Sequence, residues 1–508
     1  MSTDANLFAL IADAFTRHAN SALFELSSGA TVSRADLRAQ VSAMAGALAA
    51  AGVGLGDRVT AQADKSIAAV ALYLATLQIG AIYNPLNTAY TATEMAAFLA
   101  DAEPKAVIAT AARLAQIADR AKANGAKALF SLEADGTGTL VDAAVAARPI
   151  VDIASRSSGD LAALAYTSGT TGRSKGAMLT HGNLSSNALT LIDLWELTPG
   201  ERLIHALPIY HVHGLFVALD TALLGGLTML WMETFSAARV LAALPGADVM
   251  MGVPTFYTRL LSEPGLDRSA CSSMRLFISG SAPLLPETHK EFHARTGHTI
   301  LERYGMTETG MITSNPYDGD RIAGTVGYPL ADVSVRIADA AGHELPRDAI
   351  GGVEVRGPNV FSGYWRMPEK TAEEFRDDGW FITGDQGVMA GDGRLSLVGR
   401  AKDLIISGGL NVYPIEVEQA LNALPGIGES AVIGVPHPDF GEAVVAVVTA
   451  LASGPALPDQ AEIIATLSEH LAKFKCPKRV IAVAELPRNA MGKVTKAELR
   501  AMYKGLFG

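Results

Sequence analysis

The stretch from Leu164 to Gly176 reads LAYTSGTTGRSKG and combines hydroxyl, glycine and cationic residues. Glycines let backbone N–H groups approach an anion, and hydroxyls add further hydrogen-bond donors. The stretch departs from the G-x-x-x-x-G-K-[ST] pattern of the common nucleotide loop. A solvated turn rich in Ser and Thr has the same composition, so the stretch alone leaves both interpretations open. As a phosphate loop, it would use Thr167, Ser168, Gly169, Thr170, Thr171, Gly172 and Lys175.

Four further charged side chains that could take part in binding or catalysis follow in chain order. Glu308 comes after a glycine turn in ERYGMTETG, and a single carboxylate of this kind suits Mg²⁺ together with phosphates and water. Asp385 lies in TGD, where a carboxylate can accept hydrogen bonds from two hydroxyls. Arg400 lies in GRAKD, and Lys493 lies in a turn bounded by proline and glycine. Taken singly, each of these residues could equally be a solvated surface charge.

Together and in this order, these motifs resemble those of the adenylate-forming superfamily, which includes acyl-CoA synthetases, firefly luciferases and peptide-synthetase adenylation domains. The resemblance covers nearly the whole chain. It implies an α/β enzyme with a large N-terminal domain, a barrel-like subdomain within it, and a smaller mobile α+β C-terminal domain. It also implies ATP, Mg²⁺ and coenzyme A as cosubstrates. A carboxylate would first attack the α-phosphate of ATP, and a thiol would then displace AMP.

The resemblance assigns a role to each matching residue. Glu308 would hold Mg²⁺, with the Thr167 hydroxyl on the phosphate side, and Lys493 would bridge the attacking carboxylate and the α-phosphate. Asp385 and Arg400 would contact the ribose. Lys402 would be the hinge about which the C-terminal domain rotates. The remaining ATP-site residues would be Gly280, Ser281, Ala282, Pro283, Glu302, Tyr304, Gly305, Met306 and Thr307, and the CoA channel would include Ser407, Gly408 and Gly409.

The acid is predicted from MRLFISGSAPL. This segment leads into Gly280–Pro283, the loop that the resemblance places against adenine. On a strand, Arg275 and Ser279 share one face, and a charged residue in so apolar a segment needs an anionic partner. That partner is either a protein carboxylate or a second carboxylate on the substrate. His205 and His211, from RLIHALPIYHVHG, are expected to face the same substrate, as is Met306. These segments look most similar to malonyl-CoA synthetases, which implies malonate or methylmalonate as the acid.

Four alternatives bear on this interpretation. A ligase for a monocarboxylic acid predicts that Arg275 pairs with a protein carboxylate. A peptide-synthetase adenylation domain would normally load a carrier domain, and no phosphopantetheine DSL motif follows residue 402. A binding module without activity has no reason to keep all four charged motif residues. Luciferase-type oxidation does not suit a pocket this polar.

Composition narrows the class of protein further. The chain has 508 residues, 49 % of them hydrophobic, and a net charge of −11, which argues against a chain-wide nucleic-acid footprint. Two distant cysteines argue against disulfides, and no basic residue precedes Asp4, so we expect a cytoplasmic protein without a signal peptide. The apolar segment 66–86 is long enough to span a membrane, but its polar interruptions favour a helix buried inside a large domain.

The elements that position these residues change character along the chain. Up to about residue 400, short apolar runs alternate with amphipathic helical segments, which predicts largely parallel α/β layers. Segment 33–52 is one such helix, with Ser33 as its cap and Gly52 as its stop. From Gly351 the period becomes two, which indicates an antiparallel barrel or hairpin pair. We therefore expect domains at 1–400 and 404–508, with a hinge at 401–403.

Overall fold

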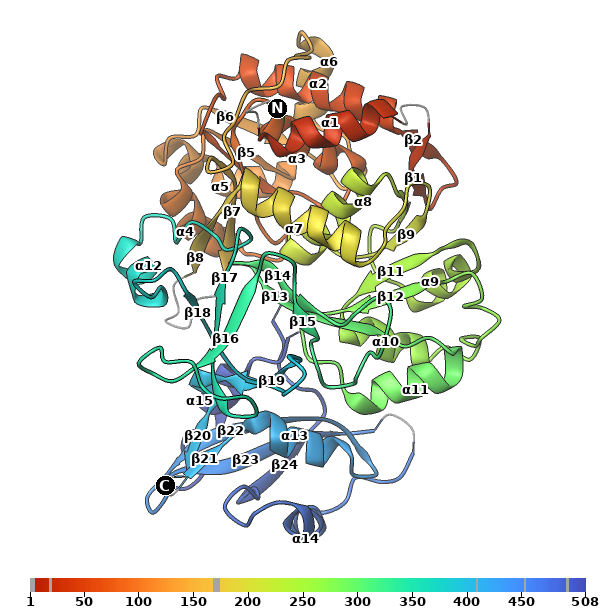
Figure 1. Ribbon diagram of the computed structural model, residues 1–508. Coiled ribbons are helices and arrows are strands. Elements are labelled where there is room, and N and C mark those ends of the chain that lie inside the picture. Colours follow the sequence, from red (N-terminus) through yellow and green to blue (C-terminus); the bar gives the residue numbers. More distant parts are fainter. Residues whose placement is uncertain (1–4, 18–20, 168–173, 408–409, 452–453, 490–492) are drawn as a thin grey trace.

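The computed structural model describes residues 5–17, 21–167, 174–407, 410–451, 454–489 and 493–508. These residues form four β-sheets with helices packed around them. In Figure 1 the C-terminal part, in blue, lies at one end of a larger N-terminal part that contains three of the sheets. The predicted fold class, an α/β protein with a large N-terminal and a smaller C-terminal domain, is confirmed.

A six-stranded sheet carries the hairpin that contains the candidate phosphate loop. Its order is β6-β5-β3-β4-β7-β8, and all neighbours are parallel except β7 and β8. Its strands are β3 (Arg58–Gln62), β4 (Ile82–Pro85), β5 (Ala106–Ala109), β6 (Ala128–Ser131), β7 (Leu161–Thr167) and β8 (Lys175–Thr180), and its helices are α2 (Arg34–Ala50), α3 (Ile67–Gln78), α4 (Ala92–Ala102), α5 (Ala111–Ala123) and α6 (Thr139–Ala146).

Helices α2 and α3 confirm two expectations from the sequence. Ser33 caps α2 in a capping box with Asp36, and Gly52 follows the helix with a φ of 83°. Helix α3 is buried at every residue except Ile67, which explains why its sequence is apolar all round. Among the described residues, no helix is long and apolar enough to cross a membrane.

A nine-stranded sheet forms the middle of the N-terminal part. Neighbouring strands from β1 to β13 run parallel, so the carboxyl ends of β9, β11, β12 and β13 meet at one edge. The strands, in sheet order, are β15 (Tyr328–Pro329), β14 (Gly310–Ser314), β13 (Leu301–Met306), β12 (Leu276–Ser279), β11 (Val249–Gly252), β9 (Arg202–His205), β10 (Thr228–Trp231), β1 (Ala22–Leu26) and β2 (Thr31–Ser33). The accompanying helices are α1 (Leu7–Arg17), α7 (His181–Leu194), η1 (His213–Leu219), α8 (Asp220–Gly225), α9 (Ala237–Ala243), η2 (Leu244–Gly246), α10 (Pro254–Leu261) and α11 (Pro286–Thr296).

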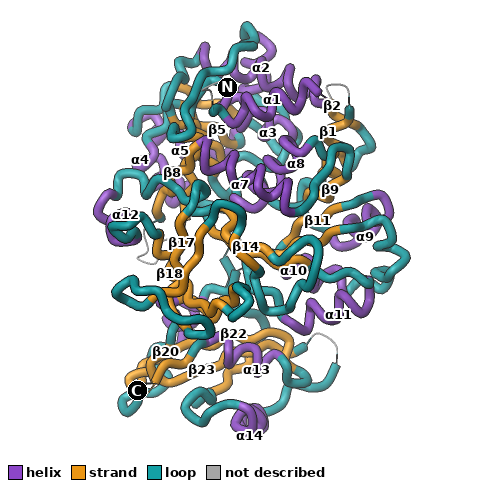
Figure 2. Tube along the Cα trace, viewed as in Figure 1, coloured by secondary structure: helices purple, strands orange, loops and turns teal. Residues whose placement is uncertain are grey.

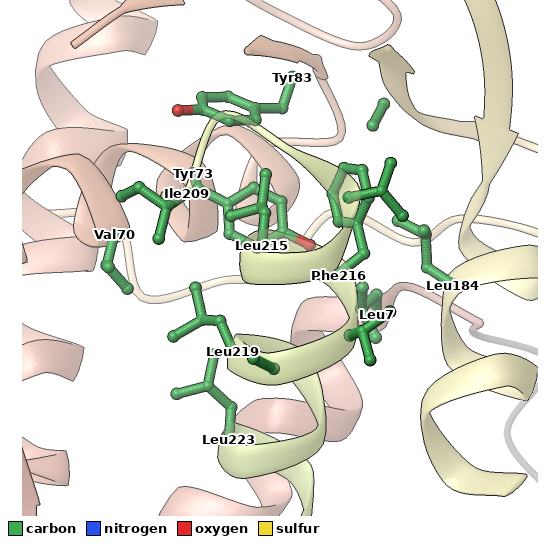
Figure 3. Close-up of a cluster of buried hydrophobic side chains, with 14 of the residues drawn as sticks. Leu7, Val70, Tyr73, Tyr83, Leu184, Ile209, Leu215, Phe216, Leu219 and Leu223 are labelled. Carbon is green, nitrogen blue, oxygen red and sulfur yellow. The ribbon is translucent and has the colours of Figure 1, made fainter. Parts of the chain in front are cut away.

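Element η1 is a π-helix that continues into α8, between β9 and β10 of the nine-stranded sheet. Figure 3 shows Leu215, Phe216 and Leu219 on this element, packed among side chains that include Val70 and Tyr73 of α3. Because π-helical turns are rare and occur frequently at functional sites, η1 draws attention to the residues at its start.

The chain then forms an antiparallel sheet and a separate C-terminal unit (Figure 2). The predicted antiparallel segment is the four-stranded sheet β16 (Ser334–Ala338), β17 (Ile350–Arg356), β18 (Phe381–Met389) and β19 (Leu395–Arg400), with α12 (Pro368–Glu374) inserted. The two apolar clusters of the C-terminal unit contain only residues after 404, so this unit has its own core. Its elements are η3 (Ala401–Asp403), β20 (Ile405–Ser407), β21 (Leu410–Val412), α13 (Pro414–Asn422), β22 (Ile427–His437), β23 (Gly441–Ala450), α14 (Gln460–His470), β24 (Arg479–Val483) and α15 (Lys496–Tyr503).

Candidate active site

The candidate phosphate loop connects two antiparallel strands of the six-stranded sheet. Thr167 pairs with Lys175 as the last rung of β7 and β8, and its hydroxyl donates to the Lys175 carbonyl over 3.5 Å. The sheet therefore fixes both ends of the loop. The predicted contacts Ser168, Gly169, Thr170, Thr171 and Gly172 lie outside the described residues.

A network of four side chains joins the end of this hairpin to Glu308. Lys175 Nζ lies 2.8 Å from Glu374 Oε1 and 4.1 Å from the ring centre of Tyr364. The Tyr364 hydroxyl lies 2.6 Å from Glu374 Oε2 and 3.0 Å from Glu308 Oε1. Since this hydroxyl has one proton, it can donate to only one of the two carboxylates at a time. Lys175 supplies the positive charge that lets both carboxylates remain close together.

Glu308 is suited to hold a cation that also contacts a ligand. Its side chain is buried, and burial raises the pKa of its carboxyl above the usual range. A divalent cation would reverse this effect by favouring the ionised form. Within the described residues, no cluster of three or more His, Cys, Asp or Glu side chains could hold a metal alone. The residues present fit a Mg²⁺ ion that shares its coordination between a carboxylate and nucleotide phosphates.

Tyr304, Asp385 and Arg400 meet where β13 approaches β18 and β19. Asp385 and Arg400 are cross-strand partners, and Arg400 Nε lies 2.8 Å from Asp385 Oδ1. The Tyr304 hydroxyl donates to the other oxygen of Asp385. Burial raises the pKa of Asp385, and Arg400 and Tyr304 oppose that shift. Three residues that the sequence analysis placed around one nucleoside therefore lie in direct contact.

Lys493 reaches the same site from the C-terminal unit. Its turn is held by a bond from the Asn489 backbone N–H to the Lys493 carbonyl over 2.9 Å. Lys493 is exposed as a whole residue. Desolvation of its ammonium and the positive charge of Arg400 lower its pKa, whereas Asp385 raises it. Glu308 acts on it in the same direction as Asp385. The structure thus brings Lys493 into the field of both carboxylates that the sequence analysis assigned to the site.

The predicted adenine loop begins at a glycine that has a steric reason to be there. A Cβ atom on Gly280 would lie 2.4 Å from Nη1 of Arg303, so a larger residue there would have to displace that guanidinium. Ser281 follows with a φ of 72° and bonds His213 Nδ1 over 3.1 Å. Ala282 and Pro283 are exposed.

Glu302 supports the loop from beneath. Its buried carboxylate accepts backbone hydrogen bonds from Gly324 and Leu284, whereas burial raises its pKa to about 8. Gly305, three residues on, cannot carry a side chain, because a Cβ there would lie 2.1 Å from the Gly310 carbonyl oxygen. Met306 and Thr307, which follow, are half-buried.

Arg303 is the cation that the sequence analysis missed. It is only 3 % exposed, and its Nε and Nη2 atoms have no hydrogen-bond partner among the described residues. Burial lowers its pKa to about 9, so it stays charged at neutral pH. The sequence pattern that could have identified Arg303 is ERYGMTE, in which an arginine lies inside a largely buried strand.

Arg275 does not have the predicted role. It precedes β12 and lies at the end of the strand opposite Ser279. Its guanidinium forms a two-point ion pair with Glu201 and donates to the carbonyls of Trp195 and Glu196 over 3.1 and 3.0 Å. The prediction that Arg275 meets the acid is therefore wrong on this geometry, because a protein carboxylate already neutralises it.

His205 is also committed to the protein. Its Nδ1 lies 2.9 Å from Lys65 Nζ, and its Nε2 lies 2.9 Å from the Gly214 carbonyl oxygen. With both ring nitrogens engaged, His205 has no hydrogen-bond donor left for a substrate. The prediction that it contacts the acid is wrong for that reason.

Two further predicted substrate residues, His211 and Ser279, lie in the same part of the site as Arg303, together with His213. Burial, Lys493 and Arg303 lower the pKa of His211 to about 3. Burial and Arg303 likewise lower the pKa of His213, whose Nε2 has no partner in the described structure. Ser279 is fully buried, and its hydroxyl is equally unpartnered there. Arg303 and Lys493 therefore act on the charge of both histidines, and Ser279 lies one residue before the glycine that the Arg303 guanidinium lies against.

The expected hinge and CoA segments lie at the junction of the two units. Lys402 is in the short 3₁₀ turn η3, between the last strand of one sheet and the first strand of the next. Ser407 is buried in β20, and Gly408 and Gly409 lie outside the described residues. Nothing in this geometry tests the roles predicted for these residues.

Comparison with known proteins identifies the family. The model of the AMP-binding enzyme family matches residues 12–365, and that of the AMP-binding enzyme C-terminal domain matches residues 416–493. A feruloyl-CoA synthase of Amycolatopsis sp is 37 % identical over 94 % of both chains. The mitochondrial malonate–CoA ligase of Homo sapiens is 36 % identical over 83 % of this chain and 78 % of its own.

Solved structures extend the comparison to the arrangement of the units. ATP-bound MatB from Rhodopseudomonas palustris is 53 % identical, with a TM-score of 0.97 over 99 % of this chain and 100 % of that chain. Apo MatB has the same identity and coverage but a TM-score of 0.85. The arrangement seen here is thus more similar overall to the ATP-bound form. The chain belongs to the AMP-binding enzyme family and is an AMP-forming acyl-CoA ligase.

Proposed function

We propose that this enzyme ligates malonate or methylmalonate to coenzyme A through an acyl-adenylate. The observation that carries the proposal is Arg303, a buried guanidinium with two nitrogens that find no partner among the described residues. Burying a cation without a counter-ion costs free energy, and an anion that binds to Arg303 offsets part of that cost. The distal carboxylate of a short diacid is such an anion.

Two cations act on the same part of the site. Arg303 and Lys493 both lower the pKa of His211. In malonate a single carbon separates the two carboxylates. One carboxylate can therefore reach Lys493 and the α-phosphate while the other stays with Arg303. His213 Nε2 and the Ser279 hydroxyl, which also find no partner in the described part of the chain, are further groups for the distal carboxylate.

The proposed mechanism gives each side chain a defined task. Lys493 stabilises the negative charge that develops as a carboxylate oxygen bonds to the α-phosphorus and pyrophosphate leaves. Asp385 and Arg400 hold the ribose, and Tyr304 stacks on adenine. Glu308, with the Thr167 hydroxyl, would hold Mg²⁺, which would neutralise phosphate charge. The CoA sulfur then bonds to the acyl carbon and AMP departs with the former carboxylate oxygen.

The monocarboxylate alternative keeps two supporting observations. Arg275 pairs with a protein carboxylate, as that alternative predicts. The proposal of a diacid therefore rests on Arg303 and not on Arg275. The feruloyl-CoA synthase and an indoleacetate–CoA ligase of Aromatoleum aromaticum, which is 34 % identical over 93 % of both chains, are named for aromatic acids. An aromatic acid, however, would leave Arg303 without an anion.

The test is CoA-dependent AMP formation from acetate, malonate, methylmalonate, succinate, octanoate and ferulate, with wild type and Arg303→Met. We expect malonate or methylmalonate to be used best, and Arg303→Met to lower kcat/KM for them by about 10²–10³, as for a lost charged hydrogen bond left unpaired. Activity with acetate and the KM for ATP should change little. A tenfold preference of the wild type for acetate, octanoate or ferulate would refute the proposal, and so would an Arg303→Met variant that loses all six acids equally.

A further inference from the structure

Lys65 is a buried charged group that the proposed mechanism does not use. It lies in the loop between β3 and α3 and is 8 % exposed. Its ammonium donates to the carbonyls of His205 and Met232, over 2.8 and 2.7 Å, and contacts His205 Nδ1 over 2.9 Å. The same ammonium lies 4.2 Å from the ring centre of Trp231.

The partners of Lys65 fix the protonation state of His205. The Nε2 atom of His205 faces the Gly214 carbonyl, which can only accept, so Nε2 carries the ring proton. The Nδ1 atom then has a lone pair and must accept from Lys65. Three acceptors around one nitrogen require three protons, and Trp231 adds the face of an aromatic ring. This set of partners favours an ammonium next to a neutral imidazole and opposes burial, which lowers the pKa of Lys65. Burial together with Lys65 also lowers the pKa of His205.

The chain of contacts ends at the acid side of the site. Gly214 is the second residue of η1, directly after His213, and its Cβ position is blocked by the Pro208 carbonyl 2.1 Å away. The segment 206–213 that leads to it carries His211, and His213 bonds Ser281 of the opposite loop. Holding the Gly214 carbonyl therefore holds the backbone beside His213, which bonds the residue after Gly280, and Gly280 lies against the Arg303 guanidinium.

We propose that Lys65 and His205 are positioning residues, which hold the segment from 206 to 214 so that His211 and His213 line the acid pocket. The six-stranded sheet, through Lys65, thereby locks a loop that belongs to the nine-stranded sheet. The inference concerns whichever acid the enzyme activates best and does not depend on malonate.

The test is ATP–pyrophosphate exchange with Lys65→Met, using the acid that the wild type activates best. Methionine keeps the length and packing of the stem but removes all three donors. We expect the KM for the acid to rise about tenfold, the scale of a lost hydrogen bond to a charged group, while the KM for ATP stays within about twofold. A merely structural role would leave the KM for the acid unchanged or raise both KM values together, and either result would overturn the proposal.

Arg34→Met is the matched control. Arg34 is also a buried cation, 1 % exposed, and it donates to the carbonyls of Ala22 and Leu227 over 3.0 and 2.9 Å. Those carbonyls lie at the start of β1 and just before β10, away from the carboxyl edge where Lys65 acts. We expect this variant to lose thermal stability without a change in the KM for the acid. An equal rise in the acid KM would show that loss of any buried cation disturbs the site, and would overturn the inference.

A measurement on the wild-type protein keeps the proposal testable if Lys65→Met does not fold. Nitrogen-15 NMR of histidine-labelled enzyme reports the tautomer of each ring, and the His205 signals are those absent from His205→Phe. The contact chain requires the neutral form with the proton on Nε2. Finding a proton on Nδ1, or an imidazolium at neutral pH, would show that Lys65 does not donate to His205 and would overturn the proposal.

Discussion

Replacing Arg275 by methionine separates stability from acid recognition, because the structure places this side chain away from the site. The change removes the two-point ion pair with Glu201, whose Nη2–Oε2 contact is 2.6 Å, and the donors to Trp195 and Glu196. The two paired side chains are 22 % and 15 % exposed. Breaking a buried pair costs about 3–5 kcal/mol and breaking an exposed pair about 0–1 kcal/mol, so we expect a loss of about 2 kcal/mol.

The assay combines urea unfolding with steady-state kinetics for Arg275→Met, Glu201→Gln and the double variant. We expect each single variant to lower the free energy of unfolding, and the double variant to lose less than the sum of the two. The kcat/KM for malonate should stay within about twofold, as for a substitution away from the site. A loss of malonate activity at unchanged stability would refute the reasoning and return Arg275 to the acid pocket.

Two further predictions concern the catalytic lysine and the carboxylate under the adenine loop. Lys493→Ala should lower ATP–pyrophosphate exchange by about 10²–10³ but retain CoA transfer from preformed acyl-adenylate, and normal exchange would contradict the mechanism. The folded pKa of Glu302, about 8, lies above its unfolded value, so the folded state binds more protons and stability falls as pH rises toward 8. Glu302→Gln should flatten that fall, whose limiting slope is about 1.4 kcal/mol per pH unit, and unfolding curves at pH 5 and pH 8 measure it.

The elements were predictable because their signals are local. The apolar run of α3, the capping box of α2 and the period-two strands of the antiparallel sheet can each be read within twenty residues. The π-helix η1 carries no such signal, because its geometry depends on side chains packed around it from α1, α3 and α7. Local patterns therefore predicted the architecture but not this irregular turn.

Sequence motifs predicted which residues belong to the site. They did not predict the role of a residue whose partner lies far away in the sequence. Arg275 precedes one buried strand and Arg303 lies inside another. The sequence does not show that Glu201 neutralises Arg275 while Arg303 has no counter-ion in the described structure. His205 reads as a pocket residue until Lys65, 140 positions earlier, is seen at its Nδ1. Charge pairing between distant segments is the information that only the fold supplies.

The contact between Gly280 and Arg303 makes the two positions depend on each other. The glycine does not serve a left-handed backbone, since Gly280 is not among the positive-φ residues; it leaves the space that the guanidinium fills. Alanine at 280 would occupy that space, so it cannot coexist with Arg303 in this rotamer. An enzyme of this family with alanine at the matching position would have to hold such an arginine elsewhere. The pair of residues is therefore a sequence marker for this pocket, whereas the arginine alone is not.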